Sequence, residues 1–138
     1  MKRALLIALT LVFSFSVKAQ NKQDVNTNPN APIISFKSDI VDYGEILQGS
    51  DGVKYFNFTN GGVEPLIISN VKSSCGCTVP HYPKTPIGPG QESQIKIKYN
   101  THRVGPFRKT VTIFSNMEGK PIVVTVKGRV VTEKTKTK

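Results

Sequence analysis

The sequence contains no tryptophan and only two cysteines among its 138 residues. Antibody-type immunoglobulin domains pair two distant cysteines beside a buried tryptophan, whereas a single residue separates Cys75 from Cys77. No segment shows helical periodicity, which leaves strands as the expected element. No G-x-S-x-G motif is present, and the nine acidic residues are scattered. The sequence therefore offers neither a serine-hydrolase nucleophile nor a carboxylate pair for sugar cleavage, and we expect no enzymatic activity.

Only one apolar run is long, and it lies at the N-terminus. Residues 1–19 combine a basic start at Lys2 and Arg3, an apolar stretch, and small residues Val17 and Ala19, which is typical of a cleaved secretory signal peptide. The run is shorter than the roughly 20 apolar residues of a membrane span. It contains no cysteine that could carry a lipid, so we expect no lipoprotein anchor. The sequence predicts a periplasmic or secreted protein without a membrane span.

The rest of the chain is long enough for one domain. Removing 19 residues from 138 leaves 119, which suits a single unit with its own hydrophobic core. Residues 20–32 are polar and rich in asparagine, which predicts a flexible leader. Residues 33–131 form the expected domain, and residues 132–138 are a polar tail.

The charge of the mature chain is moderately basic. Without the signal peptide, 16 basic and 9 acidic side chains remain, a net charge of +7. Such a balance favours an acidic partner or an anionic envelope surface. The basic residues are dispersed and no aromatic-basic recognition motif occurs, so we expect no nucleic-acid binding.

Short segments with a period of two begin after the leader. Ile95, Ile97 and Tyr99 alternate with Lys96 and Lys98, which places the apolar side chains on one face of a strand. Clusters of glycine, proline and asparagine separate such segments. About seven strands are predicted, near residues 33–36, 40–44, 53–59, 66–74, 94–100, 107–115 and 122–130. This pattern indicates an all-β fold, an immunoglobulin-like antiparallel sandwich.

The two cysteines are badly spaced for bracing a fold. If residues 74–79 continued a strand, the Cα atoms of Cys75 and Cys77 would lie about 6.6 Å apart on one face. A disulfide needs Cβ atoms about 3.8 Å apart, so a bond requires a local kink, which Gly76 permits. Closing a three-residue loop contributes only about 1.6 kcal/mol. A structural staple is therefore a poor explanation for the pair.

Three interpretations of Cys75, Gly76 and Cys77 remain open. A strained, exposed disulfide would be readily reduced and could act in redox chemistry. Alternatively, Cys75, Cys77 and His81 form a C-x-C-x3-H pattern that suits a soft metal ion, with His102 as the remaining ligand of these types. In the third interpretation the cysteines pack or pair locally at a strand end and shape the following loop. No cofactor is expected.

Four longer stretches add a family resemblance to these local patterns. They are FNFTNGG followed by EPLII, SCGCT, the P-x-G-P-G-Q segment before an alternating strand, and GPFRKTVTIFSN. Together they resemble the domain of unknown function 1573 family, whose members are exported bacterial proteins. The resemblance extends over nearly the whole chain after the signal peptide.

The resemblance implies a sandwich similar to the major sperm protein and abnormal-spindle-like domains, which act as interaction or structural modules. Cys75–Cys77 looks like the family's hallmark, whereas His81 and His102 match no family pattern. We therefore expect an exported, non-enzymatic module of the bacterial cell envelope. Its strand edges or the loop Cys75–Gly90 would bind an unidentified envelope or extracellular macromolecule. The alternative hypothesis is a thiol-redox or soft-metal-binding envelope factor that acts through the two cysteines.

Overall fold

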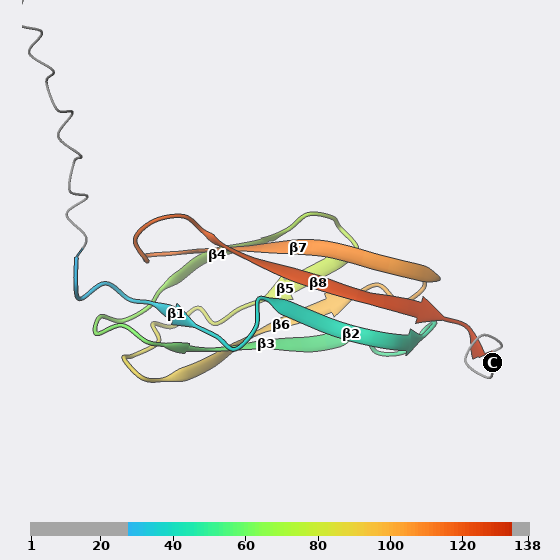
Figure 1. Ribbon diagram of the computed structural model, residues 1–138, viewed down its shortest axis with the longest axis horizontal. Coiled ribbons are helices and arrows are strands. Elements are labelled where there is room, and N and C mark those ends of the chain that lie inside the picture. Colours follow the sequence, from blue (N-terminus) through green and yellow to red (C-terminus); the bar gives the residue numbers. More distant parts are fainter. Residues whose placement is uncertain (1–27, 134–138) are drawn as a thin grey trace, which may run out of the picture.

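The computed structural model describes residues 28–133, which fold into two facing β-sheets of four strands each. The strands are β1 (Ile34–Ser35), β2 (Ile40–Leu47), β3 (Val53–Asn60), β4 (Ile68–Ser73), β5 (Thr78–His81), β6 (Glu92–Tyr99), β7 (Gly105–Ser115) and β8 (Ile122–Val131). One sheet has the order β1-β3-β6-β5 and the other the order β2-β8-β7-β4. Figure 1 shows the two sheets as layers along the long axis. The all-β, immunoglobulin-like fold class is thus confirmed.

The strand count and one strand pairing differ from the sequence-based expectation. The structure has an eighth strand, β5, which the sequence pattern hid because Pro80 interrupts a run of only four residues. The backbone N–H of Asn100 on the β6 side donates to the carbonyl of Cys77. Hydrogen-bonded residues alternate along an antiparallel strand, so Val79 also faces β6 and the nitrogen of Pro80 faces the open edge of β5. Proline is tolerated at such an edge because it has no N–H to donate. The pairing of β2 with β8 is parallel, whereas all other named strand pairs are antiparallel.

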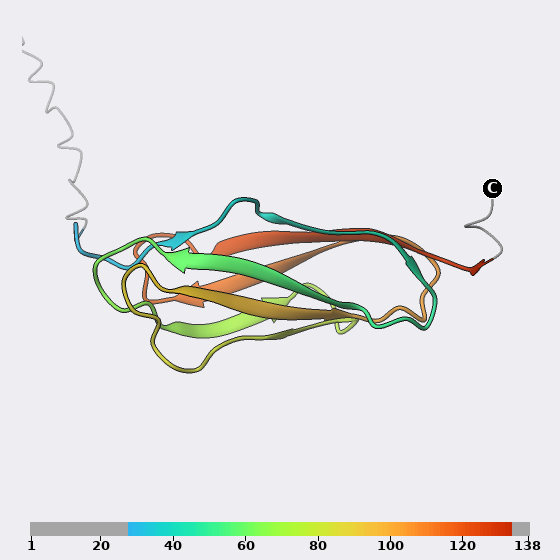
Figure 2. The same ribbon diagram turned by 90° about the horizontal axis from the view of Figure 1, so that it is seen from below.

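The parallel pair arises because the N-terminal stretch of the domain changes sheets without reversing direction. β1 pairs with the end of β3, residues 36–39 cross between the layers, and β2 then runs beside β8. Figures 1 and 2 show β1 and β2, in blue and teal, following one another along the molecule. One N-terminal stretch therefore serves as an edge strand of both sheets.

The hydrophobic core lies between the two layers and follows the predicted alternation. Ile95, Ile97 and Tyr99 are buried, while Lys96 and Lys98 on the same strand are exposed. The largest fully buried hydrophobic side chains come from both sheets and the loop before β4, and they are Leu66, Ile95, Ile97, Ile113, Val111, Val124, Val126 and Val130. Burial of this apolar surface is the main driving force for folding.

A buried tyrosine joins the two sheets across this core. Tyr43 projects from β2, and its hydroxyl lies 2.8 Å from the carbonyl oxygen of Ile97 and 3.0 Å from that of Gly52. Its ring meets Phe107 edge-on at 5.5 Å between centroids. A Cβ atom at Gly128 would lie 2.7 Å from the Cβ of Tyr43, so only glycine fits beside this ring.

A buried asparagine organises the loops at the other end of the sandwich. Asn60 is fully buried, and its side-chain oxygen accepts hydrogen bonds from the backbone N–H groups of Ile33 and Gly62. Its side-chain nitrogen donates to the carbonyl oxygens of Glu64 and Ile87. All four bonds go to backbone groups, so one side chain holds three loop segments together.

The described structure includes residues that precede the predicted domain boundary at residue 33. Residues 28–32 belong to the segment predicted as a leader, yet the backbone N–H of Asn28 donates to Glu118 and the backbone N–H of Glu64 donates to the carbonyl of Asn30. The predicted signal peptide, the rest of the leader and residues 134–138 of the tail lie outside the described residues. Within residues 28–133, no helix has the length and apolar character needed to cross a membrane.

Replacing Tyr43 by phenylalanine should lower the free energy of unfolding by about 1–2 kcal/mol, because a buried hydroxyl and its hydrogen bonds are lost. Burial, reinforced by the nearby Asp51 carboxylate, raises the pKa of Tyr43 above its ordinary value. The stabilisation is therefore complete below the unfolded-state pKa of about 10 and is lost as pH rises above it. Urea unfolding at neutral pH and at about pH 11 should show a steeper alkaline loss for the wild type than for Tyr43→Phe. Equal losses would contradict this role.

Replacing Asn60 by alanine should cost about 3 kcal/mol of unfolding free energy, because buried backbone groups lose their partners. Asn57→Ala is the matched control, since Asn57 lies on the same strand and is exposed. The control should change stability by less than about 0.5 kcal/mol. Similar urea midpoints for the two variants would show that Asn60 does not hold the loops.

Candidate functional site

The two cysteines form a disulfide in the turn where the chain passes from one sheet to the other. β4 ends at Ser73 on the edge of one sheet, and β5 begins at Thr78 on the edge of the other. The sulfur atoms are bonded at 2.06 Å and the Cα atoms of Cys75 and Cys77 are 5.4 Å apart. The extended geometry considered for residues 74–79 does not reach the cysteines, because residues 74–77 turn before β5 begins at Thr78.

The disulfide turn is attached to the sandwich on one side and open on the other. The backbone N–H of Asn100 donates to the carbonyl oxygen of Cys77 at 2.8 Å, and Cys77 packs against the core. Gly76 is exposed, and a Cβ atom there would meet no other atom within 4 Å. The turn also borders a depression of about 610 Å³, whose lining includes Lys98 and His102. The chemistry that the disulfide could perform in this position is thiol exchange.

The residues proposed as metal ligands are not brought together as a ligand set. Cys75 and Cys77 are bonded to each other, and His81 lies exposed on β5 opposite Lys96 of β6. Within residues 28–133, no group of three or more histidine, cysteine, aspartate or glutamate side chains could hold a metal ion.

The loop that follows the cysteines is held by its own contacts. The hydroxyl of Tyr82 donates to the carbonyl of Ser69, and the Lys84 ammonium lies 3.6 Å from the centre of the Tyr82 ring. Farther on, Leu66 and Ile87 exchange two backbone hydrogen bonds at 2.8 Å. The loop is therefore fixed against the domain and offers a defined surface.

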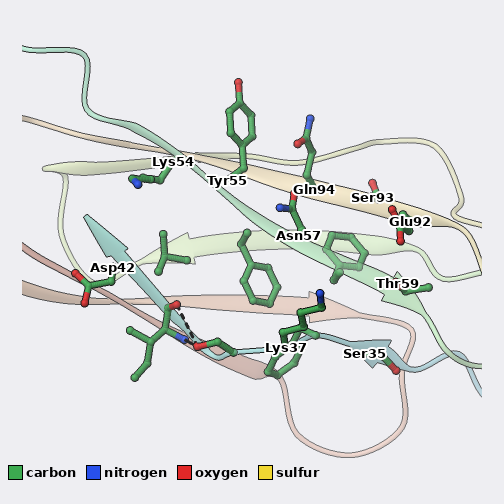
Figure 3. Close-up of a pocket in the computed structure, with 16 residues that line it drawn as sticks. Ser35, Lys37, Asp42, Lys54, Tyr55, Asn57, Thr59, Glu92, Ser93 and Gln94 are labelled. Atoms are coloured by element: carbon green, nitrogen blue, oxygen red, sulfur yellow. Dashed lines mark hydrogen bonds between the residues drawn. The ribbon is translucent and has the colours of Figure 1, made fainter. Parts of the chain in front are cut away.

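A larger groove, which the sequence did not reveal, lies between the crossover after β1 and the strand β3. Its volume is about 1060 Å³. Figure 3 shows the groove, with Ser35 and Thr59 at one end and Asp42 and Lys54 at the other. The lining comes from the crossover, β2, β3 and β6, and comprises Ser35, Phe36, Lys37, Ser38, Ile40, Val41, Asp42, Lys54, Tyr55, Phe56, Asn57, Phe58, Thr59, Glu92, Ser93 and Gln94.

Three partly exposed apolar residues line this groove. Phe36, Ile40 and Tyr55 are exposed by 36%, 39% and 47%, and they come from three different segments. The Phe36 ring packs against Phe56 at 5.2 Å between centroids, which links the groove to the core. Ile40 alternates with the buried Val41 and Tyr55 with the buried Phe56, so both side chains point to the outer faces of their sheets.

The charges around the groove are unevenly neutralised. Asp42 forms an ion pair with Lys127 at 3.1 Å. A hydrogen bond from the Gly44 backbone, followed by one from Lys127, holds the pKa of Asp42 below its ordinary value. Lys37 and Lys54 also line the groove, and no ion pair among the described residues involves either of them.

Comparison with known proteins places the chain in a family. A family described as "Protein of unknown function (DUF1573)" matches residues 34–130. The chain belongs to the DUF1573 family. Within this DUF1573 domain, the FNFTNGG stretch supplies the buried Asn60, and the SCGCT block forms the turn between the sheets. No curated protein matches the chain.

Solved structures share the fold of this DUF1573 domain. A protein of unknown function from Porphyromonas gingivalis W83 has a TM-score of 0.65 at 17% identity over 78% of this chain, which spans only 51% of that protein. The ASH / PapD-like domain 7 of human CEP192 has a TM-score of 0.64 at 6% identity, with 83% of this chain and 96% of that domain covered. The Vibrio cholerae VesB protease has a TM-score of 0.54 at 12% identity, over 75% of this chain and 32% of the protease. The TM-scores show a common fold, and at these identities they show the fold alone.

Replacing both cysteines by serine should lower the unfolding free energy by no more than about 1.6 kcal/mol, because the disulfide closes a loop of only three residues. The flanking strands β4 and β5 keep their ladders with β7 and β6. Thermal unfolding of the wild type with and without reductant, beside the double variant, checks this expectation. A loss above about 3 kcal/mol would show that the turn is a structural staple.

Proposed function

We propose that this protein is an exported, non-enzymatic interaction module of the bacterial cell envelope, which binds a macromolecular partner in the groove beside β3. The observation that carries the proposal is the groove of about 1060 Å³ between the crossover and β3, where Phe36 is 36% exposed and packs against Phe56. Concave surfaces with accessible apolar side chains are typical of binding sites, whereas single exposed apolar residues need no explanation.

The extracytoplasmic location in this proposal rests on the sequence of residues 1–19. A basic start, an apolar run and small residues before the cleavage point are typical of export signals. The disulfide between Cys75 and Cys77 is consistent with an oxidising compartment, because disulfides are rare in the bacterial cytosol. The periplasm and the exterior both satisfy this requirement.

A second candidate function is thiol exchange at the Cys75–Cys77 disulfide. It is favoured by the open space around Gly76 and by the depression beside the turn. An external thiolate would attack one sulfur to form a mixed disulfide, and the other cysteine would leave as a thiolate. Among the described residues, the hydrogen-bond partner of the Cys75 sulfur is the hydroxyl of Thr78 at 3.8 Å, which is not a base, so the groove supports the binding function better.

Site-specific photocrosslinking in cells tests the binding function. A photoreactive phenylalanine derivative placed at Ile40 or Tyr55 should give covalent adducts with an envelope component, because both positions line the groove. Ile67 is the matched control, since it is 44% exposed beside β4, at the opposite edge of the sheet from β2, and does not line the groove. Adducts that appear equally at all three positions, or at none, would contradict the proposal.

The same experiment separates the two candidate functions. In the variant with both cysteines replaced by serine, adducts at Ile40 and Tyr55 should persist, because the groove lies apart from the disulfide turn. A folded double variant that loses the cellular function while keeping these adducts would favour thiol exchange.

A further inference from the structure

We infer that the partner segment is a short extended peptide of alternating apolar and acidic residues, which adds as a strand to the free edge of β3. This inference rests on the proposed function and names the chemistry of its partner. Four observations support it. Part of β3 has unpaired backbone groups, and the β2 side of the groove has its backbone groups occupied at Ile40. The unpaired part of β3 is only six residues long, and lysines outnumber acidic residues around it.

The register of β3 identifies which of its backbone groups lack a partner strand. The Gly52 carbonyl accepts from Tyr99, and the Asn60 backbone N–H donates to Gln91. In an antiparallel ladder the hydrogen-bonded residues alternate, so the even-numbered residues between these positions face β6. The backbone groups of Val53, Tyr55 and Asn57 therefore point to the opposite edge.

β1 covers only the end of that opposite edge. Ile34 pairs with Asn60 and Ser35 with Thr59. Had β1 continued in the same register, Lys37 would lie opposite Asn57, but the chain leaves the sheet after Ser35. Within residues 28–133, no strand pairs with Val53–Phe58 on this side. Unpaired edge groups are a template for an added strand.

The other wall of the groove, at the start of β2, does not offer free backbone groups at Ile40. The Ser38 hydroxyl accepts a hydrogen bond from the backbone N–H of Ile40 at 3.0 Å and lies 3.3 Å from the carbonyl oxygen of the same residue. Figure 3 marks these bonds with dashed lines. At Ile40 the edge of β2 is thus occupied by the Ser38 side chain of the crossover, whereas β3 keeps a free edge on which a segment can dock.

The charge of the free edge favours a short acidic segment over a second copy of the domain. Six residues, Val53–Phe58, span about 20 Å of strand. A symmetric pair of β3 strands centred on Tyr55 would fit this length, but both copies would carry the same lysines, such as Lys37 and Lys54, to one edge. An acidic peptide of about six residues neutralises these lysines instead.

The charged and apolar residues around the free edge of β3 indicate which side chains the bound segment carries. Lys96 is directly opposite Tyr55 in the ladder, and Lys37 and Lys54 line the groove. The acids that line it are Glu92 and Asp42, and the latter is paired with Lys127. Figure 3 shows Lys37 reaching from the crossover toward β3. Side chains of an added strand alternate between the two faces. Apolar residues on the groove side would meet Phe36, and acidic residues on the outer side would meet the face of β3 and β6 that carries Lys96.

Nuclear magnetic resonance titration of the purified full mature chain tests the inference. The probe is a capped six-residue peptide that alternates valine with glutamate. Shifts should concentrate at Tyr55 and Asn57, and the counterpart that alternates valine with lysine should bind at least about tenfold more weakly. Equal or tighter binding of the lysine peptide would overturn the acidic chemistry.

Two N-methylated versions of the peptide test the backbone pairing. Methyl groups on one alternate set of amides block hydrogen bonds to β3, whereas methyl groups on the other set point to the open side. Since about two hydrogen bonds are lost, one version should bind at least about tenfold more weakly than the other. Equal affinities for the two versions would overturn strand addition.

A proline variant provides the complementary test on the protein. Asn57→Pro removes an N–H group that faces the free edge and leaves the ladder with β6 intact. The variant should lose peptide binding, whereas the matched control Asn57→Ser should retain it. Retained binding in a folded Asn57→Pro protein would overturn the inference, and the methylated peptides decide the question if this variant does not fold.

The remaining outcomes separate this inference from the proposed function. Absence of peptide binding, with groove adducts still formed in cells, would overturn the peptide chemistry and leave the binding function standing. Concentration-dependent dimerisation with shifts at Tyr55 and Asn57 would overturn it in favour of a second copy. Absence of groove adducts in cells would overturn the proposed function itself.

Discussion

The hydroxyl of Tyr43 ties an edge strand of one sheet to the backbone of the other. It reaches the carbonyl oxygens of Gly52 and Ile97 from β2, and its ring completes an aromatic cluster with Tyr99 and Phe107. These contacts close the sandwich at that point, and the groove lining ends one residue earlier, at Asp42. The groove is therefore bounded by a fixed cross-sheet contact, which favours a preformed site over one that must close around its ligand.

The second constraint is the division of the N-terminal stretch between the two sheets. β1 forms backbone hydrogen bonds only with the end of β3, whereas β2 pairs along the edge of β8. The crossover between them leaves a gap along β3, and the side chains of Phe36 and Ile40 line that gap. One topological feature thus produces both the apolar groove and the unpaired edge. Both candidate sites lie where the chain changes sheets, the groove between β1 and β2 and the Cys75–Cys77 turn between β4 and β5.

Local patterns predicted most of the fold because burial alternates along the strands. The inward positions of β6 and the turn-forming clusters could be identified without the structure. β5 was missed because its four residues include Pro80, and the parallel pairing of β2 could not be deduced because direction and sheet membership are long-range properties. The cysteine pair stood out by composition, and the structure shows that it forms a disulfide. The groove left no mark in the sequence, because it depends on a missing strand pair between segments far apart in the chain.

The central claim is that β3 has an unpaired edge in the free protein, and amide hydrogen exchange of the full mature chain tests it most directly. The N–H groups of Phe56 and Phe58 face β6 and should exchange slowly. Those of Tyr55 and Asn57 should exchange at least about a hundredfold faster, because no strand covers them. Equal protection along Lys54–Phe58 would contradict the account, since it would mean that another segment of the chain or a second copy already occupies the edge.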